Sequence, residues 1–228
     1  MIIVTGASSG IGKEVARLLA ENVDASNLVV ISRTDPEIVN SEWIKCDLSD
    51  SSELKELISA LKLKVNRLDF IVHCAGVMKS QSSSSLGVDD AIESFMVNTI
   101  APLCITSALS RQLAKSRGVA VVISSIASKL DIPGESIYSA TKSALDKGFE
   151  TLSADLSRLG ITFLKIHPVM IDTPMTRLLT DSQRAYMHQQ RTTKAEPSAL
   201  DLAQFIVELR ECNHFATGSS IYFGGIRR

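Results

Sequence analysis

The first twenty residues constrain the fold more than any other segment of the chain. The apolar run Ile2-Ile3-Val4 leads directly into Thr5-Gly6-Ala7-Ser8-Ser9-Gly10-Ile11-Gly12, and a helical pattern of apolar residues follows through Leu19. Glycines permit a tight turn and let backbone approach a bound group, and a helix N-terminus offers unpaired N–H groups to an anion. The segment predicts a strand, a turn and a helix that hold a pyrophosphate. Such a turn alone could also be only a tight connection.

Apolar runs alternate with longer helical patterns along the rest of the chain, which is typical of a parallel sheet with crossover helices. Seven strands are predicted at Met1–Thr5, Asn27–Ser32, Glu42–Cys46, Asp69–His73, Val119–Ser124, Thr162–His167 and Ser219–Phe223. Five helices are predicted at Gly10–Glu21, Ser51–Leu63, Asp89–Ser116, Ile137–Leu159 and Ser198–Arg210. We therefore expect one α/β domain over residues 1–228: a doubly wound, Rossmann-type domain with a seven-stranded parallel sheet and helices on both faces.

A serine, a tyrosine and a lysine form a second pattern. Tyr138 and Lys142 are four residues apart and would project from one face of a helix, while Ser125 follows a predicted strand. A free phenol has a pKa near ~10, and a nearby ammonium favours the phenolate, so we expect Lys142 to lower the pKa of Tyr138. Together the three groups could move a proton at a carbonyl. Alone, the Tyr and Lys could be exposed residues of an amphipathic helix.

In their order along the chain these motifs resemble the short-chain dehydrogenase/reductase family. The resemblance is carried by Thr5-Gly-x-x-x-Gly10-Ile-Gly12, Asn98, Ser125 and Tyr138-x-x-x-Lys142, and it covers nearly the whole chain, from Ile2 to about Gly225. It implies hydride transfer to a carbonyl, with Tyr138 as general acid and Ser125 bonded to the substrate oxygen. It also implies that Asn98 supports a water that connects Lys142 to solvent. Asn98 could instead only interrupt its helix.

The end of the second strand bears on the choice of cofactor. An acidic residue there would accept hydrogen bonds from an adenosine 2′-hydroxyl, whereas a 2′-phosphate needs positive charge and donors. The chain has Ser32-Arg33-Thr34 at this position, which favours NADP(H) over NAD(H). In the alternative, Asp35 would hold the ribose, but Pro36 indicates that the chain is already turning away.

Further cofactor contacts are implied by the resemblance alone. The glycine turn contributes Gly6, Ser8, Ser9, Gly10, Ile11 and Gly12; later segments contribute Asp47, Leu48, Cys74, Ala75, Gly76, Asn98, Tyr138, Lys142, Pro168, Ile171 and Thr173. Asp47 would lie beside the adenine, although Asp47 or Ser49 could also cap the next helix. The family usually has asparagine where Cys74 stands and glycine where Val169 stands. A β-branched residue does not adopt positive φ easily, so the backbone at Val169 differs or never needed a glycine.

The stretch 174–197 is a candidate substrate lid, because it mixes apolar and polar residues between two prolines. Met175, Leu178, Tyr186 and Met187 are candidate substrate contacts. The compact length and the segment Ile171-Asp172-Thr173 look similar to the sepiapterin reductase and benzil reductase branch, which points to diketone or aryl ketone substrates. A 3-oxoacyl thioester reductase or an alcohol dehydrogenase is the alternative. A non-catalytic protein that senses NADPH is an alternative of another class.

Composition bounds the remaining possibilities. The 24 lysines and arginines nearly balance the 25 aspartates and glutamates, which argues against a nucleic-acid or anionic-membrane partner. We expect no membrane span, because no apolar run approaches the ~20 residues that a spanning helix needs. The four cysteines, Cys46, Cys74, Cys104 and Cys212, are scattered, so we expect neither disulfides nor a metal site. The expected protein is cytoplasmic, and the resemblance implies a homodimer or homotetramer.

Overall fold

Seven parallel strands form the centre of the molecule. The computed structural model describes residues 1–22, 27–79, 85–212 and 214–227, so the polar loop that the sequence predicts at 81–85 lies almost entirely outside the described residues. The strands are β1 (Ile2–Thr5), β2 (Leu28–Ser32), β3 (Glu42–Lys45), β4 (Phe70–His73), β5 (Val119–Ile123), β6 (Thr162–Pro168) and β7 (Ser219–Phe223). Their order in the sheet is β3-β2-β1-β4-β5-β6-β7, and every neighbouring pair is parallel. All seven predicted strands are confirmed.

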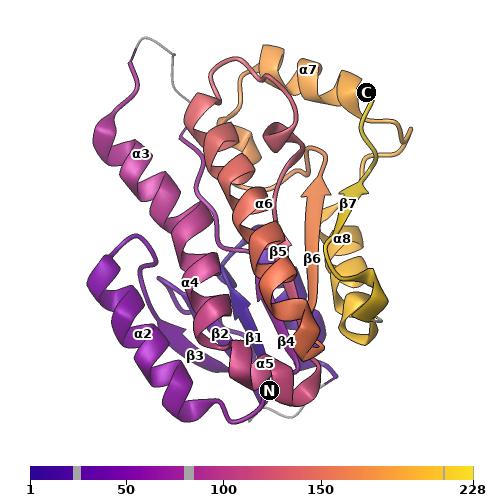
Figure 1. The fold of residues 1–228 in the computed structure, drawn as a ribbon. Coiled ribbons are helices and arrows are strands. Elements are labelled where there is room, and N and C mark those ends of the chain that lie inside the picture. Colours follow the sequence, from indigo (N-terminus) through magenta and orange to yellow (C-terminus); the bar gives the residue numbers. More distant parts are fainter. Residues whose placement is uncertain (23–26, 80–84, 213, 228) are drawn as a thin grey trace.

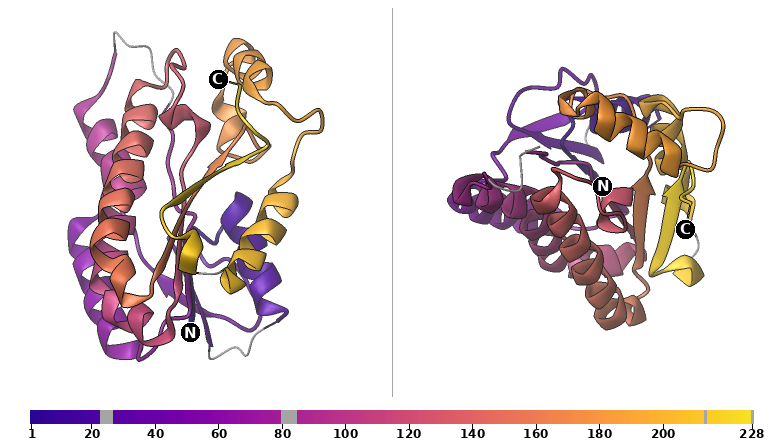
Figure 2. Two further views of the ribbon diagram at one scale, coloured as in Figure 1. Left: turned by 45° about the vertical axis from the view of Figure 1, so that its right-hand side comes forward. Right: turned by 90° about the horizontal axis from the view of Figure 1, so that it is seen from above.

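Helices cover both faces of the sheet, as parallel strands require. One face carries α1 (Gly10–Ala20) and α8 (Ala199–Glu208), and the other carries α2 (Ser51–Lys64), α4 (Ala101–Ala108) and α6 (Ser136–Leu156) (Figure 2). Successive strand residues point to opposite faces. Ile3 and Ile71 therefore belong to the core under α4 and α6, whereas Val4 and Val72 belong to the core under α1 and α8. The doubly wound α/β prediction is confirmed.

The single helix predicted at Asp89–Ser116 is wrong. The structure divides this stretch into α3 (Val88–Phe95), a π-helical turn η2 (Met96–Ile100), α4 and α5 (Ser110–Ser116). Pro102 explains the first interruption, because it has no N–H to donate to the carbonyl of Asn98 four residues earlier. The π-helical turn places Asn98 at its centre. Such turns are often found at functional sites.

One helix and several short helical turns lie where the sequence predicts none. Helix α7 (Asp181–Gln190) occupies the middle of the predicted lid and lies beyond the carboxyl ends of the strands (Figure 1). It begins with a capping box in which Thr180 and Gln183 bond each other's backbone N–H groups. The short 3₁₀ turns outside the predicted helices are η3 (Ile126–Ser128), η5 (Thr176–Leu178) and η7 (His214–Ala216), whereas η4 (Ser157–Leu159) and η6 (Leu209–Glu211) form the ends of two predicted helices.

The helical run Val88–Ala108 bears on the prediction that no segment spans a membrane. By length and composition alone this run is apolar enough to cross a bilayer, and no other run among the described residues is. However, 44% of its most apolar window is buried inside the molecule, and the run packs against α2 and α6. A single partly buried helix of this kind is weak evidence for a membrane span, since core helices share its composition.

Candidate functional site

A cleft of about 240 Å³ opens at the carboxyl ends of the strands. In the sheet, β1 lies between β2 and β4. The chain passes from β1 to β2 on one side and from β4 to β5 on the other side, and the cleft lies between these two connections. Ligands of doubly wound sheets bind at such a position. The cleft has one half at the ends of β1, β2 and β3 and another at the ends of β5 and β6 under α7. We call these the cofactor half and the substrate half.

The glycine turn forms the floor of the cofactor half. Gly6 has φ of +73°, and a Cβ atom there would lie 2.5 Å from the backbone nitrogen of Ala75. At Gly12, a Cβ would overlap the carbonyl oxygen of Gly6. Ser9 is the N-cap of α1, and its side chain makes no capping hydrogen bond, so it leaves the first N–H groups of the helix to an anion. The turn therefore fits a bound pyrophosphate.

The end of β2 presents Arg33 to the same half. Arg33 is exposed and lines the cleft. Burial raises the pKa of Asp47 on the neighbouring segment, but hydrogen bonds from Ser49 and then the charge of Arg33 lower it, and the net shift is downward. Ser32 also lines the cleft, but its hydroxyl donates to the carbonyl of Thr34 (2.7 Å). Asp35 accepts a hydrogen bond from the backbone of Glu37 (2.9 Å) and is not among the described lining residues. The alternative in which Asp35 holds the ribose thus has no support in the geometry.

The segment after β3 closes the cofactor half. Asp47 and Leu48 both line the cleft. The carboxylate of Asp47 accepts hydrogen bonds from the backbone and the hydroxyl of Ser49 (2.9 and 2.7 Å). The cap of α2 is Asp50, which accepts from Ser52 and Glu53. The suggestion that Asp47 or Ser49 caps this helix is therefore wrong, and Asp47 remains beside the cleft.

Asn98 holds the backbone that follows β4. Its side-chain oxygen accepts from the N–H of Val77 (2.8 Å), and its amide nitrogen donates to the carbonyl of Val77 (2.8 Å) and to the hydroxyl of Thr141 (3.0 Å). The side chain is 1% exposed. Asn98 thereby joins the Cys74-Ala75-Gly76 segment, which lines the cleft, to α6. These contacts make Asn98 a clamp between two walls of the cleft.

Ser125, Tyr138 and Lys142 meet at the junction of the two halves. Ser125 follows β5, and Tyr138 and Lys142 lie one turn apart near the start of α6. The Ser125 hydroxyl accepts a hydrogen bond from the backbone N–H of Ala127 (3.0 Å) and is close enough to the phenol of Tyr138 to lower its pKa. The ammonium of Lys142 donates to the carbonyl of Ile123 (2.8 Å) and lies 5.7 Å from the centroid of the tyrosine ring. The predicted catalytic side chains are thus brought together on one wall.

The pKa values differ from the prediction. Loss of solvent raises the pKa of Tyr138 to about 12, even though the hydrogen bond from Ser125 lowers it. Burial lowers the pKa of Lys142 to about 8, and Asp146 opposes this effect. The prediction that Lys142 lowers the pKa of Tyr138 is wrong for this structure, because the ammonium faces a carbonyl and the ring rather than the phenol oxygen. A phenol with this pKa stays protonated near neutral pH, which suits a proton donor.

A buried charged group beneath this wall was missed in the sequence. Asp146 lies one turn after Lys142 on α6 and is 2% exposed. Its carboxylate pairs with Lys129 (3.0 Å) and lies 3.8 Å from Nδ1 of His167, which contacts the carbonyl of Ser125 (3.3 Å). The spacing of Tyr138, Lys142 and Asp146 at intervals of four residues was a signal for it. This group ties the Ser125 loop to α6.

The segment after β6 forms the opposite side of the cleft. Pro168, Ile171 and Thr173 line the cleft as predicted. Val169 does not have positive φ, so the glycine that the family usually has here was not needed for φ. The N–H of Val169 donates to the carbonyl of Phe223 (2.9 Å), and Gly224, with φ of +91°, leaves the space that the Val169 side chain fills.

The predicted lid supplies the outer wall of the substrate half. Met175, Leu179 and Met187 line the cleft, together with Pro174 and Thr176. Tyr186 packs against the same apolar cluster but is not among the lining residues. Gln183 anchors α7 by donating from Nε2 to the carbonyl of Pro133 (2.8 Å), just before α6. The side chain of Leu178 lies outside the described part of the structure.

Most of the predicted site residues therefore share one cleft. Thr34, Asn98 and Tyr186 are described but do not line it. The lining residues that the sequence did not indicate are apolar or small: Ile31, Cys46, Val77, Met78, Val97, Ile123, Ser124, Val169, Met170, Pro174, Thr176 and Leu179. They carry no motif of their own, and only the packing of distant segments brings them to the wall.

Comparison with known proteins identifies a protein family that matches this chain. A family model described as short chain dehydrogenase matches residues 1–184. An uncharacterized oxidoreductase of Staphylococcus aureus is 29% identical over 208 residues, which cover 87% of this chain and 89% of that protein. An uncharacterized oxidoreductase of Staphylococcus epidermidis is 26% identical over 207 residues, with the same coverage.

Solved structures share the fold over nearly the whole chain. A 4-hydroxyisoleucine dehydrogenase complexed with NADH superposes with a TM-score of 0.88 at 22% identity, covering 98% of this chain and 97% of that chain. A short chain dehydrogenase from Burkholderia cenocepacia in complex with NADP gives a TM-score of 0.83 at 24% identity, covering 98% and 96%. At these identities the similarity shows the fold alone.

Proposed function

We propose, since the chain belongs to the short-chain dehydrogenase family of oxidoreductases, that it is an NADPH-dependent carbonyl reductase with Tyr138 as general acid. The observation that carries the proposal is the meeting of Ser125, Tyr138 and Lys142 at the junction between a glycine-floored half and an apolar half of one cleft. The first half suits a dinucleotide and the second suits an organic substrate.

The residues of the cofactor half fit a nicotinamide dinucleotide. Gly6 and Gly12 leave room that a Cβ atom would fill, and the start of α1 faces the cleft. Arg33 favours NADPH, because an exposed guanidinium can pair with a 2′-phosphate, while Asp35 is engaged in its own turn. Of the similar solved structures, the 4-hydroxyisoleucine dehydrogenase is complexed with NADH and the Burkholderia cenocepacia enzyme with NADP, so the preference rests on Arg33. When bound, the cofactor supplies a hydride.

The chain's own residues supply the proton and hold the substrate. Tyr138, which stays protonated near neutral pH, gives its proton to the carbonyl oxygen as the carbon is reduced to an alcohol. Ser125 donates a hydrogen bond that holds the same oxygen within reach of the phenol. Lys142 holds positive charge behind the tyrosine, and Asn98 fixes the backbone of Val77 and donates to the Thr141 hydroxyl on the same helix as Tyr138 and Lys142. The proton lost from Tyr138 is replaced by way of Lys142.

The alternatives differ in substrate or direction. A 3-oxoacyl thioester reductase that receives its substrate on an acidic carrier protein would favour a basic patch beside the cleft. Near the lid, Arg177 pairs with Asp172 (3.5 Å) and Arg191 with Glu196 (2.8 Å), so these two cations are partly neutralised. Of the reductase branches, the sepiapterin and benzil reductase type fits the short chain. Alcohol oxidation and non-catalytic sensing of NADPH remain alternatives for the test below.

The test is NADPH oxidation by the purified protein. The substrates are diketones, aryl ketones, pterins, sugars, 3-oxoacyl thioesters and, with NADP⁺, simple alcohols, each repeated with the NAD form of the cofactor. We expect consumption of NADPH with at least one carbonyl class and slower rates with NADH. NADPH binding without turnover on any carbonyl would favour the sensing role instead.

We also propose a cytoplasmic homodimer or homotetramer. Ile92 and Ile100 are exposed on the α3–α4 side of the molecule (57% and 39%), where a second copy could cover them. Leu145 on α6 is 1% exposed and belongs to the core, so it cannot contribute to such a contact. Light scattering should give a mass of at least two chains, and Ile92→Asp should lower it; Leu63→Asp, on the exposed end of α2, is the control.

A further inference from the structure

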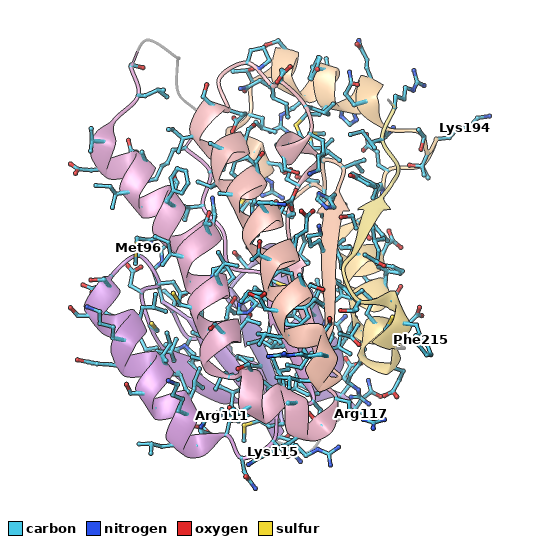
Figure 3. The ribbon with its side chains drawn as sticks, in the orientation of Figure 1. Met96, Arg111, Lys115, Arg117, Lys194 and Phe215 are labelled. Atoms are coloured by element: carbon cyan, nitrogen blue, oxygen red, sulfur yellow. The ribbon has the colours of Figure 1, made fainter. Side chains whose placement is uncertain are left out.

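A row of polar side chains is buried between β6 and α6. Lys165 and His167 of β6 point toward α6, as Phe163 does, because residues two apart share a face of a strand. The two polar residues are only 3% and 0% exposed, whereas a cation such as Lys194 projects into solvent (Figure 3). Lys165 pairs with Glu150 of α6. Burying polar groups costs free energy, so His167, beside the site, calls for a reason beyond packing.

The polar contacts of His167 gather at one nitrogen of its ring. Nδ1 lies 3.3 Å from the carbonyl oxygen of Ser125 and 3.4 Å from the hydroxyl oxygen of Ser128. Nε2 has no hydrogen-bond partner among the described residues. The ring stacks on the ring of Tyr222, with 4.8 Å between the centroids. The histidine thus faces the Ser125 turn with Nδ1.

These contacts decide which nitrogen of His167 carries the proton. A carbonyl oxygen can only accept, so Nδ1 donates to Ser125. With the proton on Nε2, a buried N–H would lack an acceptor and a lone pair would face the carbonyl, which costs free energy. The carboxylate of Asp146, 3.8 Å from Nδ1, also favours the Nδ1–H form. Burial lowers the pKa of His167, against the opposing effects of Asp146 and the Ser125 carbonyl, and the ammonium groups of Lys129 and Lys165 lower it further. The ring is therefore neutral near neutral pH.

The hydrogen bond from His167 reaches Ser125 from outside its own turn. Within η3, the Ser125 carbonyl also accepts from the backbone N–H and the hydroxyl of Ser128 (3.1 and 2.9 Å), and the Ser125 hydroxyl accepts from the N–H of Ala127 (3.0 Å). These local bonds set the shape of the turn but not its place on the sheet. That place is fixed by His167 from β6 and by Ser143 from α6, whose hydroxyl donates to the carbonyl of Ser128 (3.1 Å). A shift of the turn would carry the Ser125 hydroxyl with it.

We propose that His167, in its Nδ1–H form and supported by Asp146, is a positioning residue that holds the Ser125 hydroxyl in place for the carbonyl oxygen of the substrate. This inference rests on the proposed reductase function of the same site. His167 is not among the described residues that line the cleft, so it acts through Ser125. A misplaced group at the reacting centre slows the chemical step even where binding survives. Loss of the donor should therefore lower kcat and leave KM for NADPH nearly unchanged.

Three variants of His167 separate the donor from the volume of the ring. The amide nitrogen of asparagine is as many bonds from Cβ as Nδ1 of histidine, so His167→Asn still presents a donor to Ser125. The amide of His167→Gln lies one carbon further out, and His167→Leu has no donor. We expect kcat of the asparagine variant to stay closest to the wild-type value, and kcat of the other two to fall by about 10- to 100-fold.

The order of the three variants is the decisive result. If His167 only filled space, glutamine and leucine would replace it better than asparagine, because they leave a smaller cavity. A value of kcat for His167→Asn at or below that of His167→Leu would therefore overturn the positioning role. The matched control is His73→Gln. His73 is also buried at the end of a strand, but its Nε2 contacts Thr106 (2.8 Å) and it does not line the described cleft, so kcat should be unchanged.

A measurement without turnover tests the hydrogen bond itself. Nitrogen-15 NMR of the imidazole rings distinguishes a protonated from an unprotonated ring nitrogen, and the signal that is lost in His167→Asn belongs to His167. We expect a proton on Nδ1 and none on Nε2 near neutral pH. A proton on Nε2 would overturn the bond to Ser125, whatever the activity of the enzyme.

The kinetic outcomes also separate this inference from the proposed function. Wild-type reduction of a carbonyl, with the same kcat in all three His167 variants, would overturn the role of His167 and leave the reductase function intact. No turnover of any carbonyl by the wild-type enzyme would overturn both. Circular dichroism and fluorescence titration of NADPH check that the variants fold and bind the cofactor. If His167→Leu does not fold, the asparagine and glutamine variants carry the comparison.

Discussion

The cofactor half and the substrate half of the cleft are built by different means. Gly6 and Gly12 make the cofactor half from closely packed backbone, where an added Cβ atom would meet Ala75 or the Gly6 carbonyl. The substrate half is built from side chains, which include four methionines from three separate segments. A backbone cradle tolerates few residue types, whereas a side-chain wall tolerates many. The first half can therefore stay the same across a family while the second changes with the substrate.

The residue at the junction should have the largest effect. Tyr138→Phe removes the proton donor shared by both halves, so kcat should fall by on the order of 100- to 10,000-fold. NADPH should still bind, because the glycine turn and Arg33 are untouched. Steady-state kinetics and fluorescence titration of NADPH measure the two effects. Near-normal turnover in the variant would rule out Tyr138 as the acid.

A change confined to the cofactor half should alter only the choice of cofactor. Arg33→Gln removes the cation facing a 2′-phosphate, so KM for NADPH should rise by about 10- to 100-fold. KM for NADH should change little. The control is Lys13→Gln, which removes an exposed cation of the first turn of α1 that does not line the cleft in the described structure. An equal rise of KM for both cofactors would contradict the role of Arg33.

The pH dependence tests the charge beneath the junction. Tyr138 keeps its proton up to about pH 12, whereas Lys142 loses its proton around pH 8, so the rate of reduction should fall as pH rises through about 8. The groups that act on Lys142 are Asp146, whose charge favours the ammonium, and Cys74, a thiol whose own pKa burial raises to about 12.

Asp146→Asn should therefore move the fall in rate to lower pH, because it removes the negative charge that supports the ammonium. The pH–rate profile of kcat/KM measures the shift. Asp155→Asn, an exposed carboxylate on the same helix, should leave the profile unchanged. If both variants gave the wild-type midpoint, Asp146 would have no electrostatic effect on Lys142.

The smallest effect is expected from the cap of the lid helix. Thr180→Ala removes the capping box of α7 and costs about 1 kcal/mol of local stability. A free energy of about 1 kcal/mol corresponds to a roughly fivefold change in an equilibrium constant, so KM for a substrate should rise roughly fivefold. Cofactor binding should be unchanged. Ser198→Ala removes the equivalent capping box of α8, which packs on α1 and contributes none of the described lining residues of the cleft, so it should lower Tm similarly without changing KM. If the two variants had the same KM, α7 would make no contribution to substrate binding.

Much of the fold could be predicted because its signals are local. Each buried strand, such as Val119–Ile123, is a short run of apolar residues, and a helical pattern follows most of them. Helix α7 was missed because it is largely polar and buries only Gln183 and Met187. Its capping box at Thr180 and Gln183 was a readable signal. The break at Met96–Ile100 was also readable, from the proline at 102.

The candidate site divides in the same way. Motif spacing located Ser125, Tyr138 and Lys142, and the cofactor half followed from turns at strand ends. Motif spacing could not show that Lys142 donates to the carbonyl of Ile123, because that contact depends on how α6 lies on β5. The opposite pKa shifts of Tyr138 and Lys142 come from burial, which no spacing records.

The sequence by itself determined the family, the seven strands and the candidate reacting groups, because these depend on residue types at short, regular separations. Only the tertiary structure decided what surrounds those groups. Met78 is far along the chain from Met170, Met175 and Met187, and Asp146 and His167 come from a helix and a strand. Their meeting depends on packing across the sheet, and packing also removes the water that would otherwise set their charge and affinity.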